Sequence, residues 1–120
     1  MRVLIADDNE KYRCVARLVV DSTPGFEVAG LATSGEDAVA VAAELQPDLL
    51  LLDVRMDGIG GIEAARRITA AGTARVVVLI SAWADVDLPE RVGACGAAAT
   101  VHKRELGPEK LASLWDQYGV

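Results

Sequence analysis

Aromatic residues and cysteines are scarce in this sequence. Phe, Trp and Tyr together make up 4% of the 120 residues, so a core must be built mainly from Val, Leu, Ile and Ala. The two cysteines, Cys14 and Cys95, lack the spacing of metal ligands. We expect both to behave as small buried hydrophobic residues.

The sequence also lacks an excess of positive charge and any long apolar run. The formal net charge of -6 argues against direct binding of nucleic acid or of an anionic membrane by this chain. No apolar run reaches the roughly 18 residues of a membrane span. Asp7 also follows the N-terminus too closely for a signal peptide. We therefore expect a cytoplasmic protein that does not contact a membrane.

The chain does contain enough apolar residues for a globular domain. Hydrophobic residues make up 52% and charged residues 25% of the sequence, which is typical of a folded protein. A chain of 120 residues can bury one core but is too short for two ordinary domains. We expect residues 1–120 to form a single domain.

Five short apolar runs predict β-strands. The run Leu49-Leu50-Leu51-Leu52 shows no alternation, which is typical of a strand buried on both faces of a parallel sheet. The run Val76-Val77-Val78-Leu79-Ile80 is mostly β-branched and has the same character. We predict strands over residues 2–6, 26–31, 48–53, 75–80 and 96–101.

Helical patterns follow these runs. Within residues 10–21 the apolar positions Cys14, Val15, Leu18 and Val19 recur at helical spacing, so we expect this face of the helix to be buried. We predict helices over residues 10–21, between Ser34 and Pro47, over about 61–71 and 87–95, and from Gly107-Pro108 onward.

The alternation of strands and helices predicts an α/β fold, with a doubly wound five-stranded parallel sheet in the order 2-1-3-4-5 and helices on both faces. In such a sheet the carboxyl ends of the strands meet at one edge. Asp7 and Asp8 follow the first strand, Asp53 the third, Ser81 the fourth and Lys103 the fifth. We therefore expect these side chains to converge.

These residue types together favour phosphoryl transfer. Crowded carboxylates repel one another and suit a hard divalent cation with oxygen ligands, for which Mg²⁺ fits. A metal ion and the ammonium of Lys103 would neutralise the oxygens of a transferred phosphoryl group, and one carboxylate would be free to act as nucleophile. Taken singly, each residue has an ordinary explanation, since Asp7, Asp8 and Asp53 could merely cap a helix or end a strand.

The same residues resemble those of the receiver domain of bacterial two-component response regulators, and the likeness runs along the whole chain. The family's acidic pair matches Asp7-Asp8 and its phosphoacceptor aspartate matches Asp53. Its hydroxyl residue and its lysine match Ser81 and Lys103. The resemblance implies a flavodoxin-like fold and phosphorelay signalling rather than enzymatic turnover. Further matches to the family's pattern are Ala82, Met56, Gly61 and Gly96-Ala97.

The resemblance also implies a role for each site residue. A sensor histidine kinase would transfer a phosphoryl group to Asp53, giving an acyl phosphate. Asp8, Asp53 and the backbone carbonyl of Arg55 would bind Mg²⁺, with Asp7 acting through a bound water. Lys103 would pair with Asp53 or with the phosphoryl oxygens.

The family's switch residues are only partly matched. Ser81 would hydrogen-bond the phosphoryl group in the active state. In the family, a Tyr or Phe three residues before the lysine then changes its position. Thr100 stands there in this chain, so we expect the usual switch to be weak. Trp83, two residues beyond Ser81, is the candidate substitute. Asp57 stands where the family usually has proline, which predicts a looser and more acidic loop.

The resemblance implies that the domain, once phosphorylated, changes its binding to an unknown downstream protein. It is also compatible with a homodimer. The chain is either a stand-alone receiver or the N-terminal receiver of a regulator with a C-terminal helix-turn-helix domain. An atypical receiver with a rewired phosphorylation switch is a further alternative.

Two other classes use related folds. A haloacid-dehalogenase-type phosphatase would need a second aspartate where Arg55 stands. A flavodoxin-like electron carrier would need a first loop that accepts a flavin phosphate, which Asp7-Asp8-Asn9 would repel.

Overall fold

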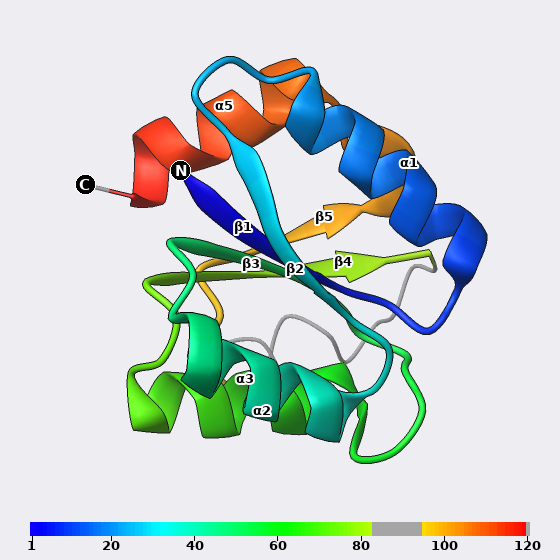
Figure 1. The fold of residues 1–120 in the computed structure, drawn as a ribbon, viewed down its shortest axis with the longest axis vertical. Helices are drawn as coiled ribbons and strands as arrows, with labels where there is room; N and C mark the ends of the chain where they lie inside the picture. Colours follow the sequence, from blue (N-terminus) through cyan, green and yellow to red (C-terminus); the bar gives the residue numbers. More distant parts are fainter. Residues whose placement is uncertain (83–94, 120) are drawn as a thin grey trace.

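The computed structural model describes residues 1–82 and 95–119. The strands in this part are β1 (Arg2–Ala6), β2 (Glu27–Ala32), β3 (Leu49–Asp53), β4 (Val76–Ser81) and β5 (Ala99–His102). They form one parallel sheet in the order β2-β1-β3-β4-β5 (Figure 1). The predicted α/β fold and strand order are confirmed.

Helices cover both faces of the sheet. They are α1 (Glu10–Asp21), α2 (Gly35–Leu45), α3 (Gly60–Ala71) and α5 (Pro108–Tyr118), with a short 3-10 turn, η1 (Lys103–Glu105). Figure 1 shows α1 and α5 on one face and α2 and α3 on the other. Residues 87–94 of the helix predicted over 87–95 lie outside the described residues. Among the described helices, none combines the length and the apolar character needed to cross a bilayer.

Strand β3 is the middle strand of the sheet and is buried on both faces. Leu50 and Leu52 pack into the core beneath α2 and α3, while Leu49 and Leu51 pack into the core beneath α1 and α5. Successive side chains of a strand point to opposite faces, so each leucine enters one core only. Each buried leucine stabilises the fold by about 2 kcal/mol. The strand therefore holds Asp53 firmly at its carboxyl end.

Side-chain caps define where two helices begin. Asn9 Oδ1 accepts a hydrogen bond from the backbone N–H of Tyr12 at 3.1 Å, so α1 starts directly after the acidic pair. Ser34 Oγ accepts from the N–H of Asp37 at 3.0 Å, and the Asp37 carboxylate accepts from the N–H of Thr33, also at 3.0 Å. These caps set the lengths of two loops at the carboxyl edge of the sheet.

Helix α1 packs on the sheet by a different face from the one its apolar pattern predicts. Ala16 and Val20 are buried, and Val19 is only partly buried. Val15 is 49% exposed and Leu18 is 67% exposed, so the predicted burial of these two residues is wrong. Two overlapping stripes on this helix share the same spacing, and the small side chain of Ala16 lets the helix approach the sheet closely.

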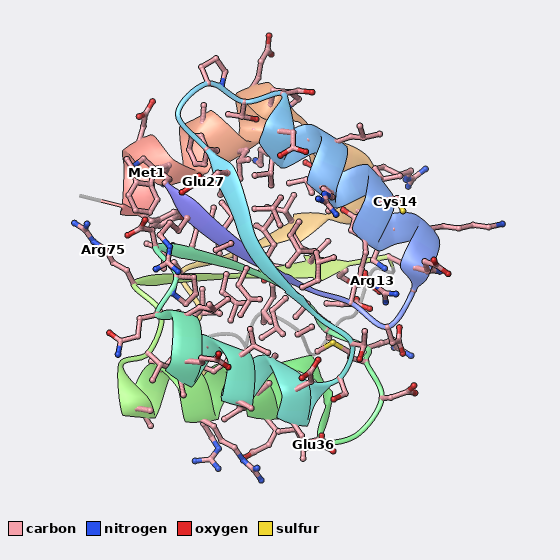
Figure 2. All side chains as sticks on the ribbon, viewed as in Figure 1. Met1, Arg13, Cys14, Glu27, Glu36 and Arg75 are labelled. Atoms are coloured by element: carbon pink, nitrogen blue, oxygen red, sulfur yellow. The ribbon has the colours of Figure 1, made fainter. Side chains whose placement is uncertain are left out.

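The two cysteines differ in their exposure to solvent. Cys95 is 3% exposed, as expected. Cys14 is exposed, so its predicted burial is wrong, and Figure 2 shows it on the outside of α1. Its exposure follows from the face by which α1 packs.

Strand β5 begins at Ala99, later than the predicted residue 96. Gly96 has a φ of 84°, in the left-handed region that residues with a Cβ adopt only with strain. A Cβ there would also press against the side chain of Thr69 on α3. Gly96 therefore belongs to the turn before the strand, and Lys103 follows the strand directly.

Candidate functional site

The structure brings the sequence-predicted site residues together at the carboxyl edge of the sheet. Asp53 is the last residue of β3 and Ser81 is the last residue of β4, and these strands are paired neighbours. Asp7 and Asp8 follow β1, on the other side of β3. Lys103 is the first residue of η1, directly after β5.

A cavity of about 210 Å³ opens between these strand ends. Its lining residues include two aspartates, one lysine, one arginine, one asparagine and one serine. The residues that line it are Asp8, Asn9, Asp53, Val54, Arg55, Ser81, Ala82 and Lys103.

Three carboxylates form a cluster at this edge. One oxygen atom from each of Asp7, Asp8 and Asp53 lies within 4.8 Å of the others. Asp7 is 2% exposed and Asp53 is 5% exposed, while Asp8 is open to solvent. Like charges this close raise the free energy of the ionised forms. Three hard oxygen donors of this kind are ligands that Mg²⁺ prefers.

The buried carboxylate of Asp7 supports a cation at this place. Asp7 Oδ1 accepts a hydrogen bond from the N–H of Asn9 at 2.8 Å. Asp7 Oδ2 is buried without a hydrogen bond, although the ammonium of Lys103 lies 2.8 Å away. Burying an anionic oxygen is unfavourable unless a donor or a cation balances it, and here the ammonium of Lys103 does so. One ammonium does not neutralise three clustered carboxylates, so the residues present fit a bound divalent cation.

Lys103 lies nearer to Asp7 than to Asp53. Its Nζ atom is 2.8 Å from Asp7 Oδ2 and 3.6 Å from Asp53 Oδ2. The lysine side chain is 17% exposed, so water screens these ion pairs only weakly. The ammonium is thus shared between two carboxylates, and the charge of Asp53 is only partly compensated.

The environment of Asp53 raises its pKa from 3.8 to about 6. Burial is the largest cause, followed by repulsion from Asp7. Lys103 and a hydrogen bond from the backbone N–H of Arg55 act in the opposite direction, and Asp8 adds a smaller repulsion. The carboxylate is therefore ionised near neutral pH but held in an unfavourable charged state, which suits a nucleophile.

Tyr12 is a site residue that sequence reasoning missed. Lys103 Nζ lies 4.3 Å from the centroid of the Tyr12 ring, and the Tyr12 hydroxyl donates to the Lys103 carbonyl oxygen at 3.5 Å. Burial, together with repulsion from Asp7 and Asp53, raises the pKa of Tyr12 to about 12, so the phenol stays neutral. Tyr12 comes from the first turn of α1, whereas the residues predicted from the sequence follow the ends of strands.

Gly61 allows α3 to begin immediately beside the phosphoacceptor candidate. The N–H of Gly61 donates to the Val54 carbonyl oxygen at 3.0 Å. A Cβ at this position would collide with the carbonyl oxygen of Asp53. Only glycine permits this approach, which gives the glycine noted in the sequence pattern a steric reason.

The predicted switch residues are less completely described. Ser81 is 6% exposed and lines the cavity. Thr100 is exposed on β5, where it pairs in register with Leu79 of β4. Trp83 lies outside the described residues, and its switch role stays a prediction from the sequence.

Comparison with known proteins agrees with this site. The family described as response regulator receiver domain matches residues 3–115. The response regulator GacA of Pseudomonas aeruginosa is 36% identical over 104 residues, which cover 86% of this chain and 48% of GacA. A protein-glutamate methylesterase/protein-glutamine glutaminase of Myxococcus xanthus is 40% identical over 116 residues, covering 95% of this chain and 33% of that protein. The chain thus spans half or less of these relatives.

A solved structure has the same fold along nearly the whole chain. The response regulator domain of Thermotoga maritima CheB superposes with a TM-score of 0.87 at 29% sequence identity, covering 99% of this chain and 96% of that domain. Family match, sequence relatives, strand order and acidic edge all agree, and the chain is a member of the receiver domain family of response regulators.

Proposed function

We propose that this domain accepts a phosphoryl group on Asp53 from a sensor histidine kinase and, once phosphorylated, changes its binding to a downstream protein. The observation that carries the proposal is the setting of Asp53, which ends the fully buried middle strand and has the ammonium of Lys103 3.6 Å from its carboxylate. Membership of the receiver family supports the same role.

In this proposal Asp8, Asp53 and the backbone carbonyl of Arg55 would hold Mg²⁺, and Asp7 would act through a bound water. When bound, the ion would neutralise negative charge on the phosphoryl oxygens. Lys103 supplies a second positive charge, since its ammonium lies within 4 Å of both buried carboxylates.

The transfer itself is a displacement at phosphorus. A carboxylate oxygen of Asp53 forms the new bond to phosphorus, and the bond between phosphorus and the donor nitrogen of the kinase histidine breaks. The product is an acyl phosphate, and the histidine regains a neutral ring after taking up a proton. Ser81 then hydrogen-bonds the phosphoryl group. The domain needs no turnover of a separate substrate for this role.

The cellular setting follows from the same proposal. A kinase that phosphorylates this domain would act in the cytoplasm. A stand-alone receiver is compatible with the proposal. The receiver of a longer helix-turn-helix regulator is also compatible, since the relatives extend well beyond the matched region. A homodimer is a further form in which the output could be delivered.

The proposal is tested by phosphorylation with a small donor. Incubation with acetyl phosphate and Mg²⁺ should add one phosphoryl group, detected by intact-protein mass spectrometry, and Asp53→Asn should abolish the addition. Asp48→Asn is the matched control, since Asp48 lies just before the other end of β3, where its carboxylate accepts from the N–H of Arg2. Equal labelling of Asp53→Asn and the control would overturn the assignment.

A further inference from the structure

The loop between β3 and α3 is fixed by the start of α2. The N–H of Gly35 donates to the carbonyl oxygen of Asp57 at 3.2 Å, and the N–H of Ile59 donates to the Glu36 carboxylate at 2.5 Å. A Cβ on Gly58 would collide with that carboxylate, and Gly58 has a φ of 81°. Figure 2 shows Glu36 against this loop. The loop is thus held in place by these contacts. The looser loop that we expected from Asp57 in the sequence is not what the structure shows.

This fixed loop presents one backbone donor to the acidic cluster. The N–H of Asp57 donates to Asp8 Oδ2 at 3.2 Å. Asp8 is the solvent-exposed member of the three aspartates, so its carboxylate has the least restraint from packing. This hydrogen bond restrains one of the two carboxylate oxygens of Asp8, while Oδ1 takes no part in it.

We propose that the backbone N–H of Asp57 makes Asp8 a one-oxygen ligand and thereby favours Mg²⁺ over Ca²⁺ at this site. The inference rests on the proposed function, in which Asp8 binds the metal. Mg²⁺ requires near-octahedral geometry with one oxygen per ligand, whereas Ca²⁺ accepts six to eight oxygens and often takes both from one carboxylate. Holding Oδ2 on the loop disfavours the two-oxygen mode.

The residue type at position 57 decides whether this donor exists. Proline, which the family usually has here, carries no N–H. Any other residue supplies one, so the inference concerns the backbone of Asp57 and not its carboxylate. The departure from the family pattern therefore adds a contact to a metal ligand, and outer contacts of this kind tune metal binding.

The test compares two variants that differ in the backbone donor. Asp57→Ala removes the carboxylate and keeps the N–H, while Asp57→Pro removes both. Mg²⁺ and Ca²⁺ are titrated separately into the metal-free domain by isothermal titration calorimetry. We expect the preference for Mg²⁺, taken as the ratio of the two dissociation constants, to be lower in Asp57→Pro than in Asp57→Ala by about 10-fold, the lower end of the effect of such outer contacts. Equal ratios in the two variants would overturn the inference.

A second variant covers the case in which Asp57→Pro does not fold, which thermal unfolding of the metal-free protein would show. Replacing the amide of residue 57 by an ester deletes the N–H and keeps the side chain, and it should lower the same ratio relative to the unmodified domain. An unchanged ratio would contradict the inference. Absence of any metal binding by the unmodified domain would instead refute the proposed metal site, so the two failures are distinguishable.

Discussion

At the scale of single residues, Asp53 is held where its charged form is unfavourable. Its pKa is about 6 in the folded protein against 3.8 for an ordinary aspartate, so the folded state binds the proton more tightly than the unfolded chain does. The free energy of unfolding therefore falls as the pH rises from about 4 to about 6, and it stays lower above that range. The carboxylate that we propose as the nucleophile thus destabilises the metal-free domain at neutral pH.

Asp53→Asn should remove this penalty. We expect the variant to match the metal-free wild type in stability near pH 4 and to exceed it by on the order of 2 kcal/mol at pH 7. Urea unfolding in the presence of a chelator, repeated at several pH values, measures the difference. A stability difference that stays constant across this range would show that ionisation of Asp53 is not its source.

Tyr12 gives a second prediction at this scale. Its ring lies against the ammonium of Lys103, and a cation–π contact of this kind is worth on the order of 1 kcal/mol. Tyr12→Leu should therefore slow phosphorylation by acetyl phosphate about fivefold. Tyr12→Phe retains the ring and should stay close to the wild-type rate. If both variants slow the reaction equally, the hydroxyl and not the ring would be the important group.

At the scale of elements, α1 shows where a sequence pattern is insufficient. Its apolar residues form two overlapping stripes, and periodicity does not say which one faces the sheet. Ala16 lies on the buried stripe and Leu18 lies 67% exposed on the other. The deciding factor is the close fit of small side chains against the large residues of the sheet, and this fit depends on contacts distant in sequence.

The orientation of α1 can be tested by two substitutions two residues apart. Ala16→Leu should overpack the buried side and destabilise the domain by about 1–3 kcal/mol. Leu18→Ala should change the free energy of unfolding by less than about 0.5 kcal/mol, because little apolar surface is lost. Chemical unfolding of both variants decides the matter. A larger loss for Leu18→Ala would mean that the helix packs by the predicted face.

At the scale of the whole molecule, the topology and much of the site could be predicted because both follow from one rule. Unbroken apolar strands that alternate with helices imply a parallel sheet, and a parallel sheet places its carboxyl strand ends together. Asp53 and Lys103 are 50 positions apart in sequence, yet their charged atoms lie 3.6 Å apart. Site residues that directly follow strands can therefore be predicted from the sequence.

Other parts of the site follow no such rule. Tyr12 contacts Lys103 by its ring from the first turn of a helix, and Asp57 contacts Asp8 by a backbone N–H that every residue type except proline possesses. The sharing of Lys103 between Asp7 and Asp53 depends on side-chain distances that no spacing encodes. These features come from the three-dimensional arrangement of the loops, which is set only when the sheet and both helix layers are packed.

The position of β5 at the margin of the sheet has a consequence for local opening. Of its four residues only Val101 is buried, and in the described part it pairs with β4 alone. Such a strand separates from its neighbour more readily than the centre does. Each separation would also draw the ammonium of Lys103 away from two buried carboxylates. The fraying of this outer strand and the charge of the acidic cluster are therefore thermodynamically linked, and a change in either must alter the other.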